Sequence, residues 1–195
     1  MVKDKELIRE RIILAAMKIF SRYGFFKAPV RLIAEEAGVS KGLVFWYFRS
    51  KQELVIEAAK RSLPLTIIDS CLQSGLSGEK LLECIGKGYM KKYKDPIQRS
   101  LLLHTMALES LYEEIAKEIN SLCEEKINEV AEKTFGSSSV EGRVAIRAFF
   151  GGLLCYILRR PKDISEEVFV KNLVNITMTG FKNKGGLNSY KRQYR

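Results

Sequence analysis

The stretch AGVSKGLVFWYF, residues 37–48, places four aromatic residues in a row. If the stretch is helical, successive side chains point about 100° apart around the helix axis. A protein core lies in only one or two of those directions, so some of the rings must stay on the surface. A helical wheel puts Val44 and Phe48 on one side and Leu43 and Trp46 on the opposite side. We therefore expect Val44 and Phe48 in a small core and Trp46 on a binding surface.

The preceding residues carry the signals of a second short helix. Pro29 suits the first position of a helix, and the small Ala34 would let a partner helix cross closely. Gly38 can adopt the left-handed conformation of a tight turn, and Ser40 is a good N-cap for the next helix. Two short helices joined by such a turn form a helix-turn-helix, whose second helix lies in the DNA major groove.

Helical periodicity continues along the chain, and no stretch alternates as a strand would. An apolar stripe begins at Ile8 and ends near Gly24, which can terminate a helix. Residues 50–53, SKQE, have the form of a capping box and begin a fourth helix, which Pro64 should end or kink. Further helices are expected near 65–74, 79–94, 97–110, 112–134, 140–159 and 166–182. The sequence therefore predicts an all-α fold.

The net charge of +10 is distributed unevenly. Residues 1–62 hold 13 Lys and Arg against 7 Asp and Glu, a net charge of +6. Residues 63–181 hold 15 against 16, and residues 182–195 hold 5 against none. A basic block beside a near-neutral remainder indicates a polyanionic partner, with nucleic acid as the first candidate and an anionic membrane surface as the second.

Composition argues against membrane insertion, secretion and a metal site. The longest uncharged run, residues 148–158, has 11 residues, whereas a spanning helix needs roughly 20. The charged N-terminus has no apolar signal core, which predicts a cytoplasmic protein with no membrane partner. No two of the four cysteines lie within four residues of each other, so we expect buried, reduced thiols, no metal and no cofactor.

Enzymatic motifs are missing from the sequence. It contains no Walker-type phosphate loop, no nucleophile elbow and no zincin helix. The Gly86-Lys87-Gly88 and Gly151-Gly152 stretches are too short to cradle a phosphate, and Gly151-Gly152 is better suited to close helix packing. The many carboxylates lie on amphipathic faces, as a solvated surface requires. We therefore expect no catalytic residues.

The segment GFFKAPVRLIAEEAGVSKGLVFWYFRSKQEL, residues 24–54, resembles the DNA-binding signature of the TetR family of transcription regulators. Its closest pieces are Ile33-Ala34, residues 37–42, Tyr47-Phe48 and Ser50-Lys51. The family implies a three-helix DNA-binding domain, a linking fourth helix and a larger helical body that binds a ligand and dimerises. We accordingly expect a DNA-binding domain at 1–50, a connecting helix at 51–64, a ligand-binding and dimerisation domain at 65–182, and a basic tail at 183–195.

The same resemblance implies roles for individual side chains. The residues implied to lie near base edges are Arg31, Lys41, Gly42, Leu43 and Phe45, and those implied to contact phosphate are Trp46, Tyr47 and Lys51.

Two positions depart from the family pattern. Ala28-Pro29 stands where a Thr pair is frequent, so a hydroxyl contact to phosphate is missing. Leu43 replaces a polar residue, which favours contact with a thymine methyl group over a hydrogen bond.

Ordinary structural roles stay open for these residues. Lys41 and Lys51 could be solvated lysines, and Trp46 could be covered by the body. Arg31 could instead pair with Glu35 on its own helix.

The last two predicted helices are apolar on more than one side. No charged residue interrupts 148–158. In 166–182, Phe169, Leu173 and Ile176 mark one side, and the other side carries Val170, Val174, Met178 and Phe181. One side can face the chain's own core and the other the same helix of a second copy across a two-fold axis. We expect a homodimer through 140–159 and 166–182.

The near-neutral, apolar body favours a repressor that binds a palindromic operator as a dimer and is released by a small apolar effector. The alternative is a constitutive or architectural DNA-binding protein without an effector. The candidate pocket residues are Leu81, Ile85, Tyr89, Leu103, His104, Met106, Tyr112, Arg147 and Phe149. A stripe of this kind also suits plain core. Tyr89, His104 and Arg147 could anchor a polar end of the ligand, or could satisfy one another. The effector, the operator and the choice between repression and activation are left open.

Overall fold

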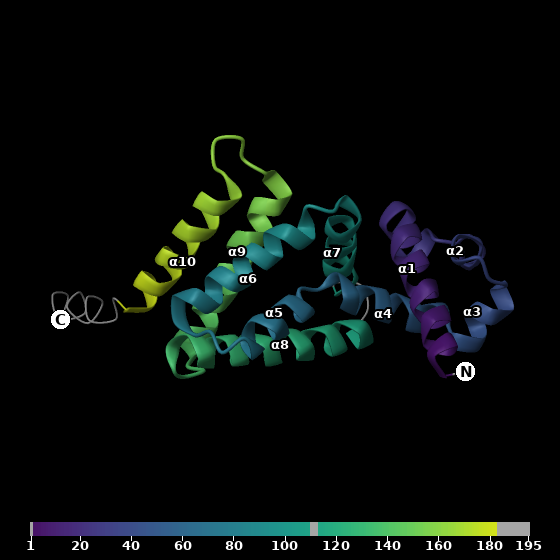
Figure 1. The fold of residues 1–195 in the computed structure, drawn as a ribbon, viewed down its shortest axis with the longest axis horizontal. Helices are drawn as coiled ribbons and strands as arrows, with labels where there is room; N and C mark the ends of the chain where they lie inside the picture. Colours follow the sequence, from purple (N-terminus) through teal and green to yellow (C-terminus); the bar gives the residue numbers. More distant parts are fainter. Residues whose placement is uncertain (1, 110–112, 183–195) are drawn as a thin grey trace. The chain divides into compact units, whose positions relative to one another are not determined.

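The computed structural model describes residues 2–109 and 113–182, and within these ranges every regular element is an α-helix (Figure 1). The helices are α1 (Val2–Lys27), α2 (Val30–Ala37), α3 (Lys41–Tyr47), α4 (Lys51–Ser62), α5 (Leu65–Gln73), α6 (Gly78–Tyr93), α7 (Pro96–Glu109), α8 (Glu113–Phe135), α9 (Val140–Arg159) and α10 (Glu166–Lys182). The predicted all-α fold is confirmed. None of the described helices is long and apolar enough to span a bilayer.

Most helix ends fall where the local signals predicted them. Gly24, with φ 72° and ψ 163°, interrupts α1 and leaves residues 25–27 as a separate last turn. Helix α4 ends at Ser62, directly before the Leu63-Pro64 pair. The expected tail at 183–195 and the candidate pocket residue Tyr112 lie outside the described residues.

The helices pack into two compact units. Unit 1 comprises Met1–Pro64 and Lys94–Asn120, and unit 2 comprises Leu65–Tyr93 and Ser121–Arg195. Unit 1 therefore holds α1 to α4, α7 and the beginning of α8. The grouping of α7 with the N-terminal helices is not visible in the sequence, and the expected domain boundaries stay a prediction.

The core of unit 1 is built on the apolar stripe of α1. Ile12, Ala16 and Phe20 are fully buried, and α1 packs against α2, α4 and α7. The Ser100 hydroxyl of α7 donates to the Ser21 carbonyl of α1 at 2.8 Å. The Ser62 and Thr105 hydroxyls, both buried, lie 2.8 Å apart and join α4 to α7. Helix α7 thus belongs to this core through polar as well as apolar contacts.

Unit 2 depends on close approaches between helices that glycine permits. Helix α6 packs against α5, α9 and α10. A Cβ on Gly86 of α6 would lie 2.7 Å from Val170 Cγ1 of α10, and one on Gly152 of α9 would lie 2.8 Å from Leu173 Cδ1. The expected packing role is therefore confirmed for Gly152. Gly151, in contrast, faces open space, because nothing lies within 4 Å of its added Cβ.

The cysteines correct one expectation. Cys71 of α5 and Cys84 of α6 form a disulfide with their Cα atoms 5.9 Å apart, and Cys155 is exposed. The expectation of four buried, reduced thiols is wrong for the disulfide pair, and of the two free thiols Cys155 is exposed and Cys123 is only half-buried. A separation of 13 residues gives no local sign of pairing. The two sulfurs meet because the turn after α5 brings α6 back along it.

Replacing Gly86 with Ala tests the close packing of α6 on α10. The new methyl group would press on Val170, which is 2% exposed and whose β-branched side chain has little rotamer freedom. We expect the overpacking to outweigh the gain in helix propensity and to lower the free energy of unfolding by about 1–2 kcal/mol. Urea denaturation measures this change. The control Lys87→Ala, on the solvent side of α6, should stay within about 0.5 kcal/mol of the wild type. If Gly86→Ala and Lys87→Ala unfolded at the same urea midpoint, the close packing of α6 on α10 would be contradicted.

Candidate nucleic-acid interface

The turn between α2 and α3 has the geometry of a helix-turn-helix. Gly38 adopts the left-handed conformation, with φ 62° and ψ 39°. Its N–H donates to the Glu35 carbonyl at 3.1 Å, which closes the last turn of α2. The Ser40 hydroxyl accepts from the Leu43 N–H at 3.1 Å and caps α3. These bonds fix the direction in which α3 leaves the turn.

The two faces of α3 divide as the helical wheel predicted for Val44, Phe48 and Trp46, but Leu43, which was expected to face outward, is half-buried. Val44 and Phe48 are 1% and 0% exposed, whereas Phe45 and Trp46 are 40% and 63% exposed. Leu43 and Tyr47 are half-buried between these faces, and Lys41 and Gly42 are exposed at the start of the helix. The aromatic run therefore serves two purposes, because Phe48, together with Val44, holds α3 in place, whereas Phe45 and Trp46 face solvent.

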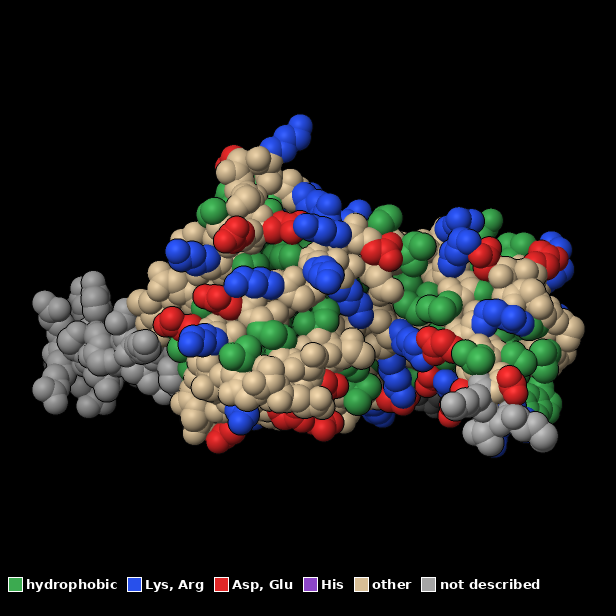
Figure 2. Space-filling model, viewed as in Figure 1, with side chains coloured by type: hydrophobic (Ala, Val, Ile, Leu, Met, Phe, Trp, Pro, Cys, Tyr) green, Lys and Arg blue, Asp and Glu red, His purple; other side chains and the backbone are tan. Residues whose placement is uncertain are grey.

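Cationic side chains lie beside the exposed rings. The Lys5 ammonium lies 5.3 Å from the centre of the Trp46 ring, and the Lys41 ammonium lies 5.9 Å from the centre of the Phe45 ring. Figure 2 shows blue Lys and Arg side chains interspersed with green hydrophobic ones over the helices of unit 1. Lys5 was not predicted as a site residue, since its proximity to Trp46 arises only when α1 packs near α3. This surface combines positive charge with stacking rings.

The start of α4 is fixed by a reciprocal cap. The Ser50 hydroxyl accepts from the Glu53 N–H at 3.1 Å, and the Glu53 carboxylate accepts from the Arg49 N–H at 2.8 Å. Lys51 donates to the Phe26 carbonyl in the last turn of α1, at 2.6 Å. Partial burial lowers the pKa of the Lys51 ammonium below its usual value. An ammonium has three donors, so two remain for a phosphate.

Arg31 forms an ion pair with Glu35, four residues further along α2, and its side chain is 72% exposed. The structure thus shows the pairing that the sequence left open. An exposed pair of this kind contributes at most about 1 kcal/mol. Transfer of the guanidinium from Glu35 to a base would therefore cost little.

The predicted ligand residues do not form one cluster. The side chains of Leu81, Ile85, Tyr89 and Phe149 are buried in unit 2. Burial raises the pKa of the Tyr89 hydroxyl, so the phenol stays neutral.

The polar candidates make other contacts. Arg147, on α9, pairs with Glu124 of α8. His104, on α7 in unit 1, meets the Phe25 ring edge-on, with the ring centres 6.2 Å apart. Leu103 and Met106, also on α7, are 40% and 44% exposed.

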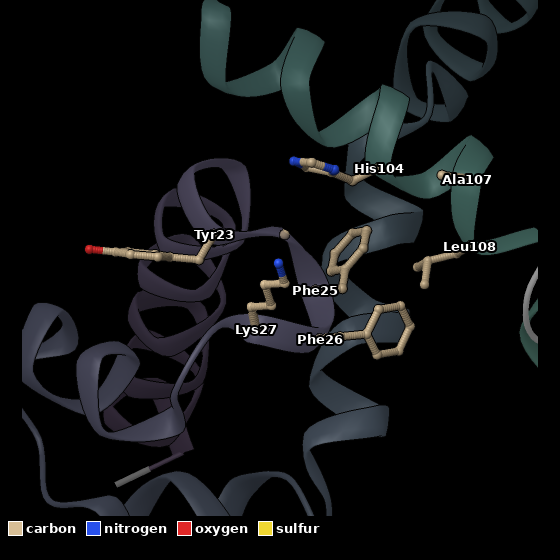
Figure 3. A pocket seen from close by; sticks show the side chains of 8 residues that line it. Tyr23, Phe25, Phe26, Lys27, His104, Ala107 and Leu108 are labelled. Atoms are coloured by element: carbon tan, nitrogen blue, oxygen red, sulfur yellow. The ribbon is translucent and has the colours of Figure 1, made fainter.

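Unit 1 contains a cavity of about 310 Å³ that the sequence did not predict as a whole (Figure 3). Its lining residues are Tyr23, Gly24, Phe25, Phe26, Lys27, His104, Ala107 and Leu108. His104 is the member of the predicted ligand set that lines it. The aromatic pair after Gly24 could have indicated this site, but its partner helix α7 lies some 80 residues further along the chain. Within the described residues, no group of three or more His, Cys, Asp or Glu side chains could hold a metal ion.

Comparison with known proteins agrees with this geometry. The family model described as "Bacterial regulatory proteins, tetR family" matches residues 12–58, which include α2, the turn and α3. Residues 12–58 thus match the DNA-binding segment of the TetR family. Its sequence is 40% identical to the HTH-type transcriptional regulator HbdR of Aromatoleum sp. (strain CIB) over 65 residues, which cover 32% of this chain and 28% of HbdR. The chain thus spans less than a third of that relative's length.

Two solved structures share the TetR fold along most of the chain. A putative transcriptional regulator from Pseudomonas aeruginosa PAO1 is 20% identical, with a TM-score of 0.71, covering 98% of this chain and 95% of that one. The regulator FadR from Bacillus subtilis, solved in complex with stearoyl-CoA, is 17% identical, with a TM-score of 0.67, covering 88% of this chain and 98% of that one. At these identities the likeness extends to the fold alone.

Substitution of Lys51 tests the phosphate contact. We expect Lys51→Ala to weaken binding to all duplex sequences alike and to reduce the slope of log K against log salt by about one unit, because one fewer counterion is released. Fluorescence anisotropy at salt concentrations from about 50 to 200 mM provides the measurement, because the affinity of phosphate contacts falls steeply over this range. Lys51→Arg keeps the charge and should keep the slope. An unchanged slope for Lys51→Ala would remove this residue from the interface.

Proposed function

We propose that this protein is a sequence-specific DNA-binding transcription regulator that reads duplex DNA through α3. The observation that carries the proposal is the exposed Phe45–Trp46 face of a helix anchored by Val44 and Phe48. The match of residues 12–58 to the TetR family model and the +6 charge of residues 1–62 support it. Binding to the genome would place the protein in the cytoplasm.

The exposed residues divide by chemistry into those that read bases and those that hold phosphate. Lys41 can donate to guanine acceptors, and Leu43 can contact a thymine methyl group. A Cβ added to Gly42 would meet nothing nearer than the Ser40 hydroxyl at 3.8 Å, so the fold itself does not require glycine there, and the missing side chain would let the backbone approach the groove closely. Trp46, Tyr47 and Lys51 would hold phosphates, and these contacts set the register of α3 without reading sequence.

Replacement of three residues at once tests the interface. We expect the variant Arg31→Ala, Lys41→Ala, Trp46→Ala to lose the retention of particular genomic fragments in gel-shift titrations with sheared genomic DNA. The control Lys80→Ala, Lys87→Ala, Glu113→Ala lies on exposed positions of α6 and α8 and should retain the wild-type fragments. Unchanged retention by the first variant would contradict the assignment of α3.

We also propose that the protein acts as a homodimer through α9 and α10. The exposed side of α9 carries Val144 and Gly151, and that of α10 carries Val168 and Ile176. Ile176 is 67% exposed, while Val170, Val174 and Met178 on the opposite side of α10 are buried in unit 2. Each helix thus has one apolar side used within the chain and one left for a second copy. A two-fold dimer would read two half-sites of a palindrome.

Ile176→Glu tests the dimer. An exposed position tolerates the carboxylate in the monomer, but a like-charged pair across a two-fold axis would be desolvated. We expect light scattering at micromolar concentration to give a dimer for the wild type and a monomer for the variant, with the helical circular dichroism unchanged. The control Lys80→Ala also changes the charge by one unit and should remain dimeric. A monomeric wild type would overturn this part of the proposal.

Release of DNA by a small apolar ligand is the third part of the proposal. The FadR structure contains stearoyl-CoA, so a protein of this fold can hold a ligand that has a long apolar chain. Pro64 supports the idea, because α4 ends beside it and a hinge at this point could transmit a motion. The alternative is a constitutive DNA-binding protein. A thermal-shift screen of fatty acyl compounds, planar aromatics and cations, followed by gel shifts, distinguishes the two.

A further inference from the structure

The cavity of unit 1 is a separate feature from the interface on α3. Its volume of about 310 Å³ is at the lower end of the range for small-molecule sites, about 300–1,000 Å³. Phe25 and Leu108 are 2% and 1% exposed and form its inner wall. Tyr23 and Phe26 are each about half exposed. A ligand could therefore reach this apolar wall from solvent.

The interruption at Gly24 shapes the cavity. The positive φ of 72° is a conformation that side chains rarely adopt. It redirects Phe25, Phe26 and Lys27 away from the line of α1. Figure 3 shows the Phe25 and Phe26 rings on the side of Leu108, with the Lys27 side chain and the His104 ring on the side of Tyr23. The cavity thus has an aromatic end and a cationic or polar end.

The lining chemistry indicates the class of ligand. The polar lining side chains are the Lys27 ammonium and the His104 imidazole, whereas the Tyr23 hydroxyl points away from the other lining residues (Figure 3), and no carboxylate is among the described residues that line the cavity. An ammonium beside apolar walls favours an anion with an apolar body. Flat rings packed against Phe25 and Phe26 gain from offset or edge-to-face contacts. A small aromatic carboxylate of one or two rings combines these features.

The cavity shares a turn with the DNA interface. Phe26 lines the cavity with its ring, while its carbonyl accepts the hydrogen bond from Lys51 at 2.6 Å. The next residues, Ala28 and Pro29, lead directly into α2. A ligand against Phe26 would therefore act on the base of the helix-turn-helix. Neutralisation of Lys27 by a bound anion would also reduce the attraction of unit 1 for a polyanion.

We propose that this cavity binds a small aromatic carboxylate and that occupancy lowers DNA affinity. The binding claim is independent of the proposed function, whereas the regulatory claim rests on it. Couplings between two ligands are typically 5- to 150-fold, so we expect occupancy to weaken DNA binding at least about fivefold.

A titration of the whole chain with 2-naphthoate, measured by isothermal titration calorimetry, tests the binding claim. One site per chain is expected, with affinity at least about tenfold higher than for the neutral 2-naphthamide, as for a charge-assisted contact. Lys27→Gln should remove this preference for the anion. Ala107→Trp should fill the cavity and abolish binding, while Leu103→Trp, on the same helix but outside the lining, should not. Equal binding by wild type and Ala107→Trp, or equal affinity for naphthoate and naphthamide, would overturn the proposal.

Anisotropy titration of a genomic duplex at saturating 2-naphthoate tests the regulatory claim. The wild type should lose affinity, and Ala107→Trp should keep its affinity with or without the compound. Naphthoate bound without any change in DNA affinity would overturn the coupling alone. A protein that binds naphthoate but no duplex under any condition would instead overturn the proposed function, so the two failures are distinguishable.

Discussion

The burial of Val44 and Phe48 is the contact on which the DNA-binding surface depends. Helix α3 has seven residues, which is too short to be stable in isolation. It exists because these two side chains, four positions apart, enter the core of unit 1 and because Ser40 caps its first turn. Because Trp46 lies on the opposite side of the helix from these two anchoring side chains, it faces solvent. The exposed aromatic face is therefore a geometric consequence of the core.

Much of this arrangement could be predicted from the sequence because it is local. Helix caps, the left-handed Gly38 and the break before Pro64 all depend on residues within four or five positions of one another. The side-chain period of a helix likewise separates Val44 from Trp46 without knowledge of any other element. The family resemblance adds roles for single residues on the same helices, and these roles stay predictions.

Features that depend on distant residues were not predictable in this way. Three such features are the Cys71–Cys84 disulfide, the packing of α7 on α1 and the cavity beside Gly24. Each brings together side chains that are far apart in sequence, and no helical period relates their positions. The candidate ligand residues illustrate the difficulty. Tyr89 and His104 both read as apolar-stripe positions with a polar group, yet they lie in different units.

Three features of unit 1 would act together when it binds DNA. Cations such as Lys51 would supply affinity through phosphate contacts, and α3 would supply specificity through base edges. The last turn of α1 adds a control point, because Phe26 belongs to the cavity and to the hydrogen bond that holds Lys51. Exposed ion pairs such as Arg31–Glu35 are weak enough to be exchanged on binding.

Selection of binding sites from a pool of random duplexes is the most direct test of the claim that α3 reads DNA sequence. The account predicts that wild-type protein enriches one two-fold symmetric site, with half-site centres about 34–36 Å apart or at a multiple of that spacing. Enrichment of no sequence, despite salt-dependent binding to the whole pool, would contradict it and would leave a sequence-independent DNA-binding protein.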